Sequence, residues 1–130
     1  MRIDAHLEKA ARFEATLAKL SYEEDYETMI EDFLLAAAHL VNAAIHKERI
    51  VREDADIKHN RLFGFLKEQP AEEYARLASC IQQLEQLRPS HVYGKGRNGA
   101  TVRAAERLFL EMKNTCMGVL GREREPSGSV

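Results

Sequence analysis

The feature that most limits what this chain can fold into is an alanine-rich apolar stretch over residues 33–45, which reads FLLAAAHLVNAAI. Alanine is the best helix former, and Phe33, Ala37, Leu40 and Ala44 recur at intervals of four, three and four, as on one face of a helix. No segment of the chain alternates apolar and polar residues, as a strand would, for more than a few positions. We therefore predict an all-α protein with this stretch in its core.

The same helical periodicity recurs along the chain and predicts four long helices and one short helix. We expect long helices over residues 4–20, 22–48 and 71–88, a short one over 60–69, and a last long helix whose apolar stripe runs from Val102 to Val119. Ser21 and Glu24 form a capping box that would start the second helix. We expect these helices to form an up-and-down antiparallel bundle.

One domain accounts for most of the chain, because 130 residues suffice for a single core. We place this domain over residues 1–121, treat the polar residues 122–130 as a disordered tail, and expect a loop over 90–99. Alanines in the second helix allow another helix to approach closely, at Ala36, Ala37, Ala38, Ala43 and Ala44. That neighbour belongs either to the same chain or to a second copy in a dimer.

Composition limits the function classes. The net charge is −2, so the chain has no overall basic field, and any contact with nucleic acid would be local. The amino-terminal residues lack an apolar leader and no window approaches a membrane span, which predicts a cytoplasmic protein with no membrane contact. Cys80 and Cys116 lack CxxC spacing, and we expect buried thiols.

The second predicted helix carries a polar stripe opposite its core face, at Asp25, Asp32, His39, Asn42, His46 and Arg49. Asp32, His39 and His46 are seven residues apart, which is roughly 10 Å of helix per step. One ion needs ligands about 2 Å away, so this helix alone cannot supply a mononuclear site, and we expect no metal and no cofactor. A site shared with another helix, a solvated or dimer-facing stripe, and the wall of a cleft all stay open.

Residues 49–58 form a charged segment that is either a salt-bridged connector or part of a site. As a site, Arg52 would clamp a phosphoryl group and His59, six residues further on, would transfer protons. His39, His46 and Arg49 would support ligand binding. Glu53, Asp54 and Asp56 would repel a phosphate unless they pair with basic side chains.

Three segments in order, LLAAAHLVNAAIHKE, KHNRLFGFLKE and LEQLRPSHVYGKG followed by VRAAERLFLEMK, resemble the HEPN family (higher eukaryotes and prokaryotes nucleotide-binding domain). The matching positions include His39, Arg88, Tyr93 and Gly94. The resemblance implies a homodimeric helical bundle that binds nucleotide or RNA. In toxin members it implies metal-independent RNA cleavage by an arginine followed, after four to six residues, by a histidine.

Only Arg52 and His59 match that motif by position, and they are our catalytic candidates. The resemblance also implies a small nucleotidyltransferase as partner in a toxin–antitoxin pair. The sequence therefore predicts a nucleotide- or RNA-binding protein that is either a ribonuclease or without catalytic activity. The alternative function is a non-catalytic protein-interaction module.

Overall fold

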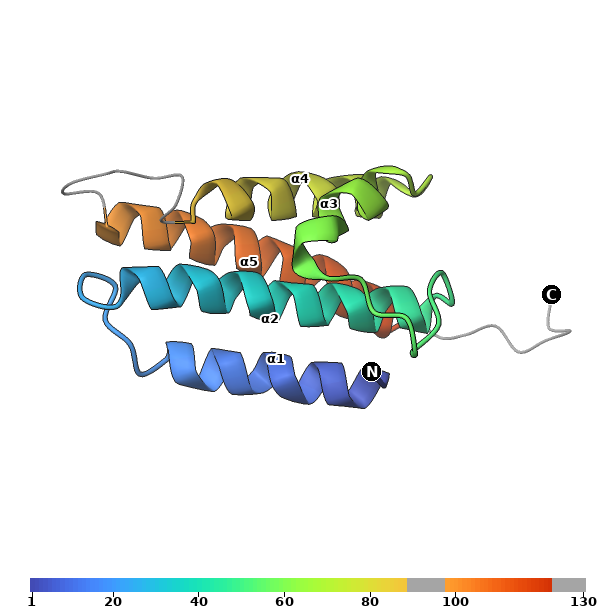
Figure 1. Ribbon diagram of the computed structural model, residues 1–130, viewed down its shortest axis with the longest axis horizontal. Helices are drawn as coiled ribbons and strands as arrows, with labels where there is room; N and C mark the ends of the chain where they lie inside the picture. The colour runs from blue at the N-terminus through green and yellow to red at the C-terminus, as the bar shows by residue number, and fades with distance from the viewer. Residues whose placement is uncertain (89–97, 123–130) are drawn as a thin grey trace, which may run out of the picture.

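The computed structural model describes residues 1–88 and 98–122, which form five α-helices (Figure 1). The helices are α1 (Ile3–Leu17), α2 (Tyr26–Lys47), α3 (His59–Lys67), α4 (Glu72–Gln86) and α5 (Asn98–Leu120). None of these residues lies in a strand, so the all-α prediction is confirmed for this part of the chain. Residues 89–97 and 123–130 lie outside the described part of the chain, so most of the predicted loop (90–99) and of the predicted tail (122–130) is not described, and α5 begins inside the predicted loop.

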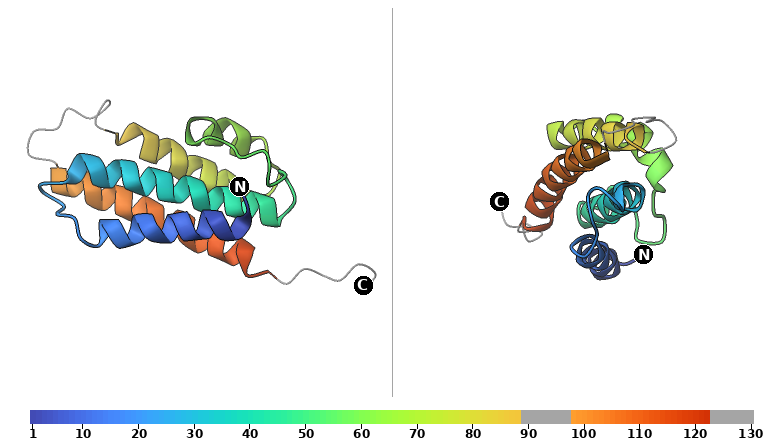
Figure 2. Two further views of the ribbon diagram at one scale, coloured as in Figure 1. Left: turned by 60° about the horizontal axis from the view of Figure 1, so that its bottom comes forward. Right: turned by 90° about the vertical axis from the view of Figure 1, so that its left-hand side faces the viewer.

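Helix α2 lies at the centre of the molecule. It packs against α1 on one side and α5 on another, while α4 packs on α5 and α3 on α4, as the end-on view of Figure 2 shows. The alanines of α2 are buried inside the single chain: Ala36, Ala37, Ala38, Ala43 and Ala44. Their close neighbours are therefore helices of the same chain. Cys80 and Cys116 are buried free thiols, as predicted.

Helix α2 begins four residues later than predicted. Ser21 does bind the backbone N–H of Glu24, with 3.3 Å between Oγ and N, but Asp25 reaches back to the N–H of Ser21 at 2.8 Å. These two hydrogen bonds hold residues 21–25 in a turn, and the helix starts after it. Helix α1 also ends earlier than expected, at Leu17.

The carboxyl end of α2 turns the chain back toward α1. The N–H of Ile50 binds the carbonyl of Ile45 and the N–H of Arg49 binds that of His46, at 2.9 and 3.1 Å. This is the hydrogen-bond pattern of a Schellman motif, and Arg49 has the positive φ (58°) that the motif requires. The turn directs residues 50–58 along the flank of α2.

Helix α2 is also long and apolar enough to cross a membrane by length and composition, which corrects our expectation that no window approaches a span. However, 67% of the apolar window is buried inside the fold, a pattern that a core helix also produces.

Candidate functional site: a histidine cluster beside the start of α3

Three segments far apart in sequence bring His6, His39, His46 and Asp56 together. Nε2 of His6 and Nε2 of His46 lie 2.9 and 2.8 Å from the same oxygen, Oδ1 of Asp56. Nδ1 of His6 lies 2.9 Å from Nδ1 of His39. We call these four residues the histidine cluster. It joins α1, α2 and the segment between α2 and α3.

Asn42 fixes the position of Asp56 in this cluster. Its amide oxygen accepts a hydrogen bond from the N–H of Ile57 at 2.8 Å, and its amide nitrogen donates to the carbonyl of Ile57 at 2.9 Å. Asn42 and His46 are buried, so at these two positions the polar stripe of α2 is not solvated. It is instead covered by α1 and by residues 50–58.

Burial and charge shift the pKa values of the side chains in this cluster in opposite directions. Burial lowers the pKa of His6, although the hydrogen bond with Asp56 works against this, and burial also lowers the pKa of His39. Burial would raise the pKa of Asp56, but hydrogen bonds from His46, His6 and the amino group of Met1 outweigh it and lower that pKa to about 2. Asp56 is therefore a carboxylate throughout the neutral range.

A pocket of about 320 Å³ lies between this cluster and the start of α3. His39, Asp56, Lys58 and His59 line it, together with the first residues of α3. Among the described residues, no side chain caps the amino end of α3, where Lys58 takes the N-cap position. We call this cavity the α3 pocket.

His59 is oriented by an acidic side chain. Its Nδ1 lies 3.0 Å from Oε1 of Glu85, and Oε2 of Glu85 accepts a hydrogen bond from Arg88 at 3.3 Å. Arg88 also binds Glu31, with 2.6 Å between Nε and Oε1. Glu85 thus links His59 to Arg88, one of the residues that carry the family resemblance, whereas Tyr93 and Gly94 lie outside the described residues.

The two catalytic candidates line different pockets. Arg52 is 84% exposed, binds Asp54 (3.1 Å between Nε and Oδ1), and lines a neighbouring pocket of about 340 Å³ with His46 and Arg49. His59 lines the α3 pocket, which it shares with His39. The predicted pairing of acids with basic side chains occurs at Asp54, while Asp56 pairs with histidines instead.

Sequence reasoning missed His6 and did not assign Asp56 a role in a site. A signal for His6 existed, because residues 6, 10, 13 and 17 share one helical face and the last three are the apolar stripe of α1. Asp56 carried no such signal. Its position depends on a turn and on a long-range hydrogen bond from Asn42.

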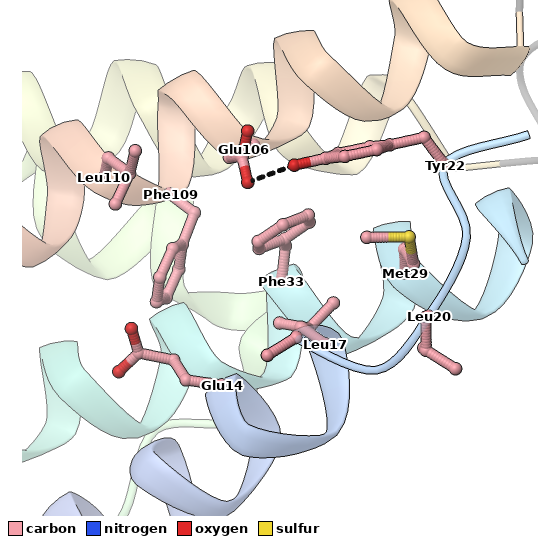
Figure 3. Close-up of a pocket in the computed structure, with 10 residues that line it drawn as sticks. Glu14, Leu17, Leu20, Tyr22, Met29, Phe33, Glu106, Phe109 and Leu110 are labelled. Carbon is pink, nitrogen blue, oxygen red and sulfur yellow. Dashed lines mark hydrogen bonds between the residues drawn. The ribbon is translucent and has the colours of Figure 1, made fainter.

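A third, mostly apolar cavity of about 240 Å³ lies between α1 and α5, with α2 as its floor (Figure 3). Leu17, Phe33 and Phe109 line it, and the hydroxyl of Tyr22 donates to Glu106 at 2.8 Å at its edge. Leu110, which lines the cavity, and Met117 are exposed at about half of their surface.

Comparison with known proteins adds no relative. No family model, no curated protein and no solved structure matches the chain.

Proposed function

We propose that this protein binds a nucleotide or RNA through the α3 pocket, as a HEPN-like homodimer in the cytoplasm. The proposal includes the up-and-down bundle of four long helices and one short helix. The observation that carries it is the meeting of Lys58, His39 and His59 in one pocket at the uncapped amino end of α3.

This arrangement suits a phosphate for two physical reasons. The amino end of a helix carries a partial positive charge and unpaired N–H groups, which together bind anions. Lys58 adds a full charge at the same end. The carboxylate of Asp56 opposes anion binding, but the positively charged amino group of Met1, 3.1 Å from its Oδ1, offsets part of its field.

The binding step is tested with fluorescently labelled RNA and with nucleoside monophosphates. Lys58→Gln should weaken binding at least tenfold and reduce the salt dependence by about one phosphate contact. Lys67→Gln is the matched control, because it removes the same charge from the far end of the same helix. Equal affinity for both variants would contradict the proposal.

The catalytic activity that we propose for this pocket is metal-independent cleavage of RNA. Glu85 holds Nδ1 of His59, which leaves Nε2 as the atom that would take a proton from a ribose 2′-hydroxyl. Wild-type protein should then cleave RNA in the presence of EDTA, and His59→Gln should not. Cleavage that survives in His59→Gln, with the same products, would remove His59 from the mechanism.

The alternative function, a non-catalytic interaction module, is favoured by one observation. Leu110 and Met117 are exposed on the same helix, and Leu110 lies beside the apolar cavity between α1 and α5. Exposed apolar surface beside an apolar cavity is typical of protein contacts. This function predicts co-purification with a partner, for which the resemblance implies a small nucleotidyltransferase, and no thermal shift with nucleotides.

A further inference from the structure

We propose that His6, His46 and Asp56 bind a divalent first-row transition metal, with Zn²⁺ as the first choice. This inference does not rest on the proposed function, because it concerns the inner side of the histidine cluster. It also departs from our expectation of no metal site, which considered ligands from the second helix alone.

The geometry of the three side chains is close to that of a metal site. One ligand atom from each of the three residues lies within 4.8 Å of the other two, and Oδ1 of Asp56 is 2.8 and 2.9 Å from the two histidine nitrogens. A tetrahedral Zn²⁺ ion with ligands at about 2.0–2.1 Å separates them by about 3.3 Å. The two nitrogen–oxygen distances are therefore within about half an ångström of those around a bound ion.

The second nitrogen of each histidine is already held, as in established metal sites. Nδ1 of His46 lies 2.9 Å from the carbonyl oxygen of Val51, which can only accept, so this nitrogen carries the hydrogen. Nδ1 of His6 is held by His39. A histidine that donates its other N–H to a backbone carbonyl presents its lone pair to a metal in a fixed orientation.

With its hydrogen on Nδ1, the neutral ring of His46 has no hydrogen to donate to Asp56, so the contact between them needs a cation. In the neutral ring of His46, Nε2 bears a lone pair and faces a carboxylate oxygen, so two acceptors lie 2.8 Å apart. Either a second proton or a metal ion must lie between them.

The ion would keep an open coordination position. His6 and Asp56 both line the α3 pocket, so water or a ligand oxygen can approach from that side. The amino group of Met1 lies 3.1 Å from both oxygens of Asp56 and competes for them. Three protein ligands and one open position are the arrangement of catalytic rather than structural zinc sites.

The test uses full-length protein without a histidine tag, stripped with EDTA and titrated with Zn²⁺ and with Co²⁺. We expect one ion per chain by calorimetry, a tetrahedral Co²⁺ spectrum, and a higher melting temperature with Zn²⁺. Asp56→Asn should weaken binding at least tenfold. Asp54→Asn, the same change two residues away on an exposed side chain, should bind like wild type.

Substoichiometric binding, or equal affinity in Asp56→Asn and wild type, would overturn the proposal. If Asp56→Asn does not fold, X-ray absorption of the wild-type zinc complex replaces it. Two imidazole ligands are then expected in the first coordination shell, and a shell without imidazole would overturn the assignment. The binding of RNA and nucleotides is to be measured with EDTA present, so that failure of the metal site and failure of the proposed function are distinguishable.

Discussion

The amide of Asn42 connects α2 to the segment that carries Asp56. It makes hydrogen bonds to the carbonyls of Ala38 and Ile57 and accepts one from the N–H of Ile57, and the side chain is only 3% exposed. Replacing it with alanine leaves the backbone groups of the half-buried Ile57 without their partner. An unsatisfied buried polar group costs roughly 1–3 kcal/mol.

Asn42→Ala should therefore lower the free energy of unfolding by about 2–3 kcal/mol in urea denaturation. Gln83→Ala is the control, because the amide of Gln83 hydrogen-bonds only within its own exposed helix turn. A loss in Asn42→Ala no greater than in this control would show that Asn42 does not anchor the segment.

The positions of some single residues could be predicted from the sequence, whereas their long-range contacts could not. The place of His46 and His39 on one face of α2 follows from helical spacing, and so does the burial of the apolar stripes. The contact of His46 with Asp56 does not follow from helical spacing. Asp56 reaches His46 because the chain reverses at Arg49 and because Asn42 holds the segment that carries Asp56. Long-range polar contacts of this kind have no periodicity.

The end of α2 is the element whose geometry most affects the site. Arg49 adopts a left-handed conformation, with φ at 58°, where glycine is the usual residue. A side chain in this region costs roughly 1 kcal/mol relative to glycine. The turn is nevertheless required, since it directs residues 50–58 back over His46.

Arg49→Gly should raise the free energy of unfolding by about 0.5–1 kcal/mol, measured by urea denaturation, because it relieves this conformation. Glu48→Gly, one residue earlier in right-handed helical conformation, should lower it by a similar amount. Destabilisation by Arg49→Gly would mean that the contacts of the arginine side chain stabilise the fold by more than its left-handed backbone conformation costs.

The existence of each helix could be predicted, but several of their ends could not. The stripes of α4 and α5 are buried as predicted, at positions such as Leu77, Ile81, Phe109 and Met112. The predicted start of α2 was wrong because the side chain of Asp25 accepts a hydrogen bond from the N–H of Ser21 and completes a turn. Side-chain hydrogen bonds decide where a helix begins and ends. In a sequence, the same side chain has several possible hydrogen-bond partners, so these ends could not be predicted.

At the scale of the whole molecule, the prediction of a homodimer concerns the surface around Leu110. Wild-type protein should elute as a dimer in size-exclusion chromatography with light scattering. Leu110→Arg should shift it toward monomer, because a charge would enter an apolar contact. Gln82→Arg adds the same charge at an exposed position on α4, outside the cavity, and should remain dimeric.

A wild-type monomer at the same concentration would contradict the dimer. A dimer that persists in Leu110→Arg would place the interface elsewhere. The cavity beside Leu110 could not be predicted from sequence, because it depends on how α1 and α5 both pack on α2. The sequence left open whether the helix close to the alanines of α2 belongs to the same chain or to a second copy, and these alanines are covered within the chain.

The central claim, that a phosphate-bearing ligand binds in the α3 pocket, is tested most directly by the NMR signals of the five histidines during titration with a short RNA in EDTA. Single substitutions assign the signals. We predict that His59 and His39, which line the pocket, shift progressively and saturate, and that Lys58→Gln reduces both shifts. Saturating binding that leaves the signals of His59 and His39 unchanged would contradict the claim.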